Sequence, residues 1–173
     1  MSHLYAIGLG SNRPHGRYGL PARILDAVLK ELQPVAASAI VETAPVGPSL
    51  RIFANAAALV ETKLSPPELL RHLKAIERRF GRRRGQRWGA RVLDLDILLW
   101  SGGRWSSATL SIPHRHLTDR LFALDPLGQI APDWKIPRHG TVRQHLARLT
   151  RPRPVHRSGR GRVRSSVGRA SDF

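Results

Sequence analysis

Two aspartates on one predicted strand are the groups in this sequence with the clearest chemical potential. In residues 93–97 the apolar Leu93, Leu95 and Ile97 alternate with Asp94 and Asp96. Successive side chains of a β-strand point to opposite faces of its sheet, so both carboxylates should share one face, roughly 7 Å apart. Two carboxylates this close repel each other unless a cation lies beside them.

The cation could be an arginine or a metal ion. Five arginines precede the aspartates, at positions 82, 83, 84, 87 and 91. In one interpretation the strand is half buried and its aspartates pair with these arginines. In the other the aspartates bind Mg²⁺, which takes one or two carboxylates together with substrate phosphates, while the arginines bind the remaining phosphate charge. Spacing alone leaves both open.

Composition and charge restrict the class of protein. The chain has 173 residues, 41% of them hydrophobic, which suits one domain with one core. It has no cysteine, which excludes disulfides, a thiolate nucleophile and a cysteine-bearing zinc site. The N-terminal segment lacks a basic region, and no apolar run approaches the roughly 18 residues of a membrane helix. A cytoplasmic protein without a membrane partner is expected.

The net charge of +17 is unevenly distributed. Residues 138–173 carry ten arginines and a single acidic residue, Asp172. Residues 151–173 also lack apolar periodicity, which predicts a disordered basic tail after a domain of residues 1–150. The tail could contact nucleic acid or be a solvated appendage. The rest of the chain is moderately basic, as binders of polyphosphates and of nucleic acids both are.

The elements that position the aspartates follow from hydrophobic periodicity and cap residues. Helices begin at Pro21 and after Ser65, and Gly81 ends the second. Strands are predicted at 4–9, 35–43, 52–62 and 93–100, and helices at 21–32, 66–80 and 118–124. A turn at Gly102-Gly103 should return residues 104–110 antiparallel to 93–100. This order predicts an α+β protein, a ferredoxin-like split βαβ sandwich with a mostly antiparallel sheet and an extra hairpin.

Three further motifs could bind a ligand. Residues 8–12, GLGSN, lack the Lys-Ser/Thr ending of a phosphate-binding P-loop and are interpreted mainly as a tight turn. Residues 43–47, TAPVG, form a rigid loop that either exposes its backbone to a flat heterocycle or is simply a turn. Phe53 and Asn55 share a strand face, which suits stacking on and pairing with a base or pterin, or a cross-strand packing pair.

Four single residues are more ambiguous. Glu77 lies near the C-terminal end of its helix, where a carboxylate is unfavourable, and could pair with nearby arginines. His114 could donate to a phosphate or be a surface histidine. Arg120 could supply a cation, and Phe122 either a ring for the ligand or a core side chain.

Taken in order, the motifs resemble a known family over about residues 4–137. They are Gly10-Ser11-Asn12, Thr43-x-Pro45-x-Gly47, Phe53-x-Asn55, Ile76-Glu77, Gly81-Arg82-x-Arg84, Arg87-Trp88-Gly89-Ala90-Arg91-x-x-Asp94-x-Asp96-Ile97-Leu98 and Ile112-Pro113-His114. The family is that of 6-hydroxymethyl-7,8-dihydropterin pyrophosphokinases. The resemblance implies transfer of the pyrophosphoryl group of ATP to the pterin hydroxymethyl oxygen, with release of AMP, in folate biosynthesis.

The resemblance also implies roles for individual residues. Asp94 and Asp96 would bind two Mg²⁺ ions and act with Arg82 and Arg91 in catalysis. The residues implied at ATP are Glu77, Arg84, Trp88, Ile97, Ser111, His114, Arg115 and Arg120. Those implied at the pterin are Thr43, Val46, Phe53, Asn55 and Phe122. The chain departs from the family pattern at Ala90, commonly proline, and at Arg115, commonly proline or tyrosine.

The alternative to the enzyme is an RNA-binding module of the same fold class. Such a module stacks bases on paired aromatic residues of its central strands. Aspartates stand on the strand in question here and would repel phosphate without a metal. We therefore expect ATP and the pterin as partners, no specific nucleic acid, and a monomer.

Overall fold

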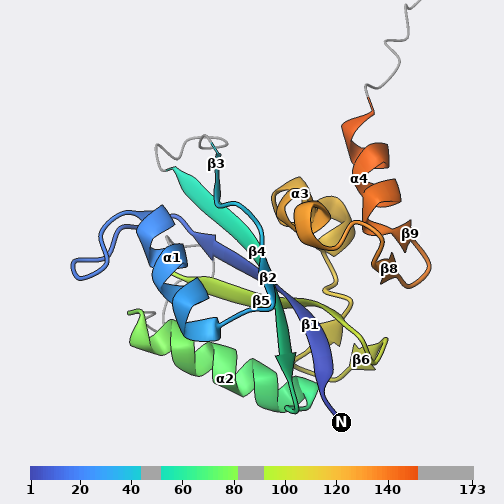
Figure 1. The fold of residues 1–173 in the computed structure, drawn as a ribbon, viewed down its shortest axis with the longest axis horizontal. Helices are drawn as coiled ribbons and strands as arrows, with labels where there is room; N and C mark the ends of the chain where they lie inside the picture. Colours follow the sequence, from blue (N-terminus) through green and yellow to red (C-terminus); the bar gives the residue numbers. More distant parts are fainter. Residues whose placement is uncertain (44–51, 82–91, 152–173) are drawn as a thin grey trace, which may run out of the picture.

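The fold is built on one antiparallel sheet of five strands. The computed structural model describes residues 1–43, 52–81 and 92–151, and the following account is confined to them. Strands lie in the order β2-β4-β1-β5 (Figure 1). Strand β3 pairs with the N-terminal end of β4, whereas β2 pairs with a more C-terminal part of it. Their bounds are β1 (His3–Ser11), β2 (Ala36–Ala37), β3 (Val41–Thr43), β4 (Phe53–Thr62) and β5 (Asp94–Trp100). Strand β5 therefore lies at one edge, beside β1.

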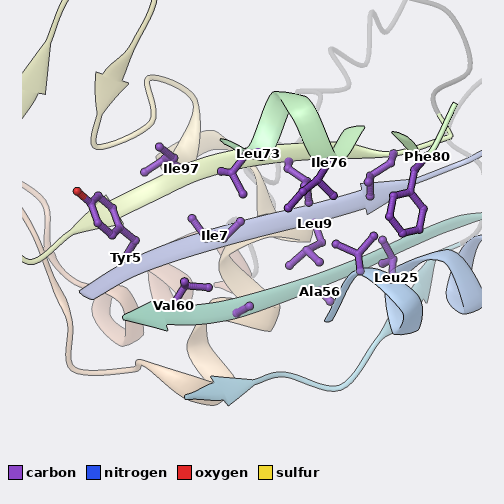
Figure 2. Packing of buried hydrophobic residues seen from close by; sticks show 14 of the residues in the cluster. Tyr5, Ile7, Leu9, Leu25, Ala56, Val60, Leu73, Ile76, Phe80 and Ile97 are labelled. Carbon is purple, nitrogen blue, oxygen red and sulfur yellow. The ribbon is translucent and has the colours of Figure 1, made fainter. Parts of the chain in front are cut away.

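Helices α1 (Pro21–Leu32) and α2 (Pro66–Arg79) cover one face of this sheet. Pro21 occupies the first turn of α1, as predicted, and the Glu68 carboxylate accepts the backbone N–H of Ser65 at the start of α2. The apolar stripes of both helices pack on alternate residues of the strands, as Figure 2 shows for Leu25, Leu73 and Ile76 against Ile7 and Leu9. This layer contains the main hydrophobic core.

Part of the opposite face is covered by C-terminal elements, the single turn η1 (Leu117–Asp119) and helix α3 (Leu121–Ile130). Helix α4 (Val142–Thr150) packs on α3. A second core cluster joins them to the sheet, and its members on the strands are Ala6, Ala57, Leu59, Leu98 and Leu99. Neither cluster includes Gly8, Gly10, Asn55, Asp94 or Asp96, which share this face. The end of the face that carries the aspartates therefore lies outside the packed core.

Two short hairpins complete the described chain, β6 (Trp105–Ser106) with β7 (Ser111–Ile112) and β8 (Lys135–Ile136) with β9 (Gly140–Thr141). The prediction that residues 104–110 pair with the strand at 93–100 was wrong, because β6, which lies in this segment, pairs with β7. Gly103, with φ of +95°, does form a turn, and its N–H donates to the carbonyl of Trp100. The predicted return strand therefore pairs with β5 only at its start, in the bridge between Trp100 and Gly103.

Two other expectations need correction, and one helix was not predicted. The strand predicted at 35–43 is divided into β2 and β3 around Ser38, whose Oγ accepts the N–H of Ala57. The helix predicted at 118–124 is instead η1 followed by α3, which continues past Pro126 to Ile130. Helix α4 was not predicted, although Thr141 caps it by accepting the N–H of Gln144. No helix in the described ranges combines the length and apolarity that a bilayer span requires.

Candidate functional site

The alternation predicted for β5 is confirmed. Leu93, Leu95 and Ile97 are buried in the main core, whereas Asp94 and Asp96 are partly exposed on the opposite face. The apolar residues pack β5 against α2, which places both carboxylates on the opposite face of the sheet. A shift of one residue would bury both charges.

Strand β1 leaves the space beside the two carboxylates open. In the pairing register Asp96 lies opposite Gly8, and Asp94 lies opposite Gly10. On the other side of β1, Gly10 lies opposite Asn55 of β4. The expectation of a tight turn at Gly8 and Gly10 was wrong, because both lie inside β1. Their lack of side chains makes a floor between Asn55 and the aspartates, which we call the glycine floor.

The two glycines differ in the space above them. Among the described residues, a Cβ on Gly10 would have a single heavy atom within 4 Å, the Asn55 Oδ1 at 3.6 Å. A Cβ on Gly8 would meet carbons of Leu98 at 3.2 Å. Leu98 approaches because β5 has a bulge there, where the register passes from Ile7–Ile97 to Ala6–Leu99. The bulge ends the alternation and closes the glycine floor with an apolar side chain.

Three residues predicted to bind a heterocycle, Thr43, Phe53 and Asn55, lie on β3 and β4 beside the glycine floor. Asn55 is 8% exposed and faces Val41 of β3, while Phe53 faces Thr43. These four residues share one face with Gly10, by the period of two along β4. Phe122 at the start of α3 is 48% exposed, so it is not a core side chain, and the Arg120 guanidinium lies 5.7 Å from its ring centroid. Val46 lies outside the described residues.

His114 is brought next to the carboxylates although 18 positions separate it from Asp96. Its backbone N–H donates to the carbonyl of Leu98 at 3.0 Å, which fixes this segment along β5. Its Nε2 lies 3.9 Å from Oδ2 of Asp96. Burial lowers the pKa of His114 below 6.5 and outweighs the opposing effect of the Asp96 charge. The imidazole is therefore mostly neutral at pH 7, despite its acidic neighbour.

The remaining residues implied at ATP are spread around β5. Ser111 lies in β7 and donates to the carbonyl of Pro113, and Arg115 is exposed. The Ile97 side chain lies in the main core, on the face away from the aspartates. Glu77 is 1% exposed, and its Oε1 accepts the backbone N–H of Leu95 at 2.8 Å. The residues Arg82, Arg84, Trp88, Ala90 and Arg91 lie outside the described ranges.

The donor set suits a hard cation that retains water or phosphate ligands. Within 1–43, 52–81 and 92–151, no three histidine, aspartate or glutamate side chains gather as a metal cage. Two carboxylates on one strand face, with a glycine floor beside them, leave most coordination positions to other ligands. Mg²⁺ is bound in this way, by one or two carboxylates plus substrate phosphates. Asp94 and Asp96 therefore fit Mg²⁺.

Comparison with known proteins agrees with this geometry. The model of the 7,8-dihydro-6-hydroxymethylpterin-pyrophosphokinase family matches residues 6–132. Three curated relatives carry the name 2-amino-4-hydroxy-6-hydroxymethyldihydropteridine pyrophosphokinase. The Synechocystis protein is 37% identical over 80% of this chain and 71% of its own length. The Methylorubrum extorquens protein is 40% identical over 83% and 91%, and the Pseudomonas aeruginosa protein 42% over 76% and 82%. The resemblance seen in the motifs is thus confirmed, and the chain belongs to the 7,8-dihydro-6-hydroxymethylpterin-pyrophosphokinase family.

Proposed function

We propose that this chain transfers the pyrophosphoryl group of ATP to 6-hydroxymethyl-7,8-dihydropterin on the open end of its sheet. The products are AMP and the pterin diphosphate, a step of folate biosynthesis. The observation that carries the proposal is the row formed by Asn55, Gly10 and Asp94 across β4, β1 and β5. A heterocycle-binding amide and a cation-binding carboxylate stand on either side of a bare glycine.

The acceptor would lie across this row. The Asn55 amide offers both a donor and an acceptor to the edge of a pterin, and the ring of Phe53 offers a flat apolar surface. The hydroxymethyl group would then point over Gly10 towards Asp94. Its oxygen attacks the β-phosphorus of ATP, and the bond from that phosphorus to the α,β-bridging oxygen breaks to release AMP.

The triphosphate would lie above β5. We propose that Asp94 and Asp96 hold Mg²⁺, two ions by the family resemblance, which supplies charge neutralisation and alignment for phosphoryl transfer. The neutral imidazole of His114 can donate one hydrogen bond to a phosphate oxygen without the cost of burying a cation. Arg120 offers a full charge at the same edge. Arg82 and Arg91 are proposed as further phosphate ligands, and Arg84 and Trp88 as ATP contacts.

We infer a ferredoxin-like split βαβ arrangement for the sheet. Support comes from the strand order β2-β4-β1-β5, in which α1 follows β1 and α2 follows β4. Both helices lie on the face away from the aspartates, and the end of the other face that carries the aspartates lies outside the packed core. A monomer in the cytoplasm stays a prediction, and size-exclusion chromatography with light scattering tests the oligomeric state.

The product distinguishes this reaction from ordinary phosphoryl transfer. The chain is incubated with ATP, Mg²⁺ and the pterin, and nucleotides are separated by chromatography. AMP should form in step with the pterin diphosphate, and only when all three are present. ADP in place of AMP, or AMP at the same rate without the pterin, would contradict the proposal.

A further inference from the structure

The outer edge of β5 is covered by two side chains of α2. An edge strand exposes backbone groups that need partners. At Leu95, the residue between the two aspartates, the N–H donates to Oε1 of Glu77 at 2.8 Å, and the carbonyl accepts from Nζ of Lys74 at 3.2 Å. One peptide segment is thus held by an acceptor and a donor from the same helix.

The two side chains are also bonded to each other. Lys74 Nζ lies 2.6 Å from Oε1 of Glu77, three residues further along α2. Glu77 is 1% exposed, whereas the Lys74 side chain is 33% exposed and reaches the site along the helix surface. Burying a carboxylate is costly unless it is paired and hydrogen-bonded. Helix α2 is already fixed by Leu73 and Ile76 in the core (Figure 2), so this pair does more than attach it.

We propose that Lys74 and Glu77 are positioning residues that hold Asp94 and Asp96 in the geometry needed for the metal. The inference rests on the function proposed above. Asp94 and Asp96 flank Leu95, so the orientation of both side chains depends on the two peptide units that Leu95 shares with them. The bonds from Glu77 and Lys74 to Leu95 restrict rotation of these two peptide units.

Two other roles would leave different signatures. A pair that only stabilises the fold would, when broken, lower the melting temperature without a specific change in metal affinity. A pair that contacts the nucleotide itself, as the resemblance implies for Glu77, would weaken nucleotide binding even in the absence of metal. A positioning pair acts on metal binding, because partners that orient metal ligands commonly change affinity by about 10- to 100-fold.

The test uses the full chain with three substitutions, Glu77→Leu, Glu77→Gln and Lys74→Met. Glu77→Gln keeps an oxygen that can accept the Leu95 N–H. Lys74→Met keeps most of the apolar stem and removes the charged amine, and the partly exposed site tolerates it if Glu77→Leu does not fold. Glu68→Ala is the control, because it removes the N-terminal cap of the same helix far from Leu95.

Mn²⁺ is titrated in the presence of a saturating non-hydrolysable ATP analogue, and broadening of the amide signals of residues 94–96 is followed by NMR. The exchange rate of the Leu95 amide is measured on the same preparations before Mn²⁺ is added. We expect the Mn²⁺ midpoint to rise about tenfold in Glu77→Leu and severalfold in Lys74→Met. Glu77→Gln should recover most of the loss, and Glu68→Ala should match the wild type. Exchange of the Leu95 amide should accelerate only in Glu77→Leu and Lys74→Met.

Midpoints that match the wild type in both Lys74→Met and any folded Glu77→Leu would overturn the proposal. So would a raised dissociation constant of the analogue in EDTA with an unchanged Mn²⁺ midpoint, which would assign Glu77 to the nucleotide. Absence of broadening at 94–96 in the wild type would overturn it together with the metal site. The wild-type AMP assay separately decides the reaction, so the two failures are distinguishable.

Discussion

The glycine floor makes a prediction in which stability and activity move in opposite directions. The change is Gly10→Ala, which places one methyl group between Asn55 and Asp94. The added Cβ would lie 3.6 Å from Oδ1 of Asn55, an ordinary contact, and Gly10 is not among the glycines with positive φ. The folded backbone therefore accepts alanine without strain.

The magnitudes follow from this fit. Replacing glycine by alanine at a compatible position stabilises a protein by about 0.4–1 kcal/mol, chiefly by restricting the unfolded chain. For a chain of this size that corresponds to a rise in melting temperature of roughly 1–4 °C. The same methyl lifts the acceptor away from Asp94, and a misplacement of about 1 Å can cost on the order of 100-fold in rate. We expect at least a tenfold loss, about 1.4 kcal/mol, in kcat/KM.

The assay compares thermal melts and AMP formation on the same preparations. Gly16→Ala is the matched control, because a Cβ there meets no atom of the described residues within 4 Å and the residue lies outside the sheet. Its kcat/KM should equal that of the wild type. Full activity in Gly10→Ala would refute the use of the floor by the substrate, and a lower melting temperature would refute the packing argument.

Three further predictions follow from the same structure. The pKa of His114 is lowered in the folded state, so the unfolded chain binds the proton first and stability falls as the pH drops below about 6.5; His114→Gln should lose less stability between pH 7 and pH 5 in urea titrations. Ser65→Ala should lower the free energy of unfolding by about 1 kcal/mol and leave AMP formation unchanged. A chain ending at Thr150 should keep the wild-type melting temperature and rate, since residues 151–173 were predicted to lack a core.

The sequence predicted best where local pattern and burial coincide. The alternation around Asp94 and Asp96 located both carboxylates, because a strand buried on one face allows a single register. Pro21 and Ser65 marked the helix starts, because cap chemistry is local. Helix α4 is missing from the predicted elements because the many arginines of residues 138–173 hide its short apolar pattern, although Thr141 and Gln144 form a capping pair.

The parts that could not be predicted depend on contacts between distant segments. The sequence around Gly8 and Gly10 is typical of a turn. Only their pairing with β4 and β5 shows that they lie inside a strand and form the glycine floor. His114 reaches Asp96 through a backbone bond to Leu98, which no spacing encodes. The partners of Leu95 come from α2, and edge coverage of this kind depends on how helix and strand pack. Period and composition carry no information about such contacts.

The metal site at Asp94 and Asp96 is the centre of this account, and Asp96→Ala tests it most directly. The side chain lies outside both core clusters and is 33% exposed, so its loss opens no cavity and relieves repulsion from Asp94. Melts in EDTA and AMP formation with Mg²⁺ are measured on one preparation. We predict a melting temperature at or above that of the wild type, a rate lower by several powers of ten, and little change in pterin affinity. An Asp96→Ala protein that forms AMP near the wild-type rate, or one that is strongly destabilised without metal, would contradict the metal site.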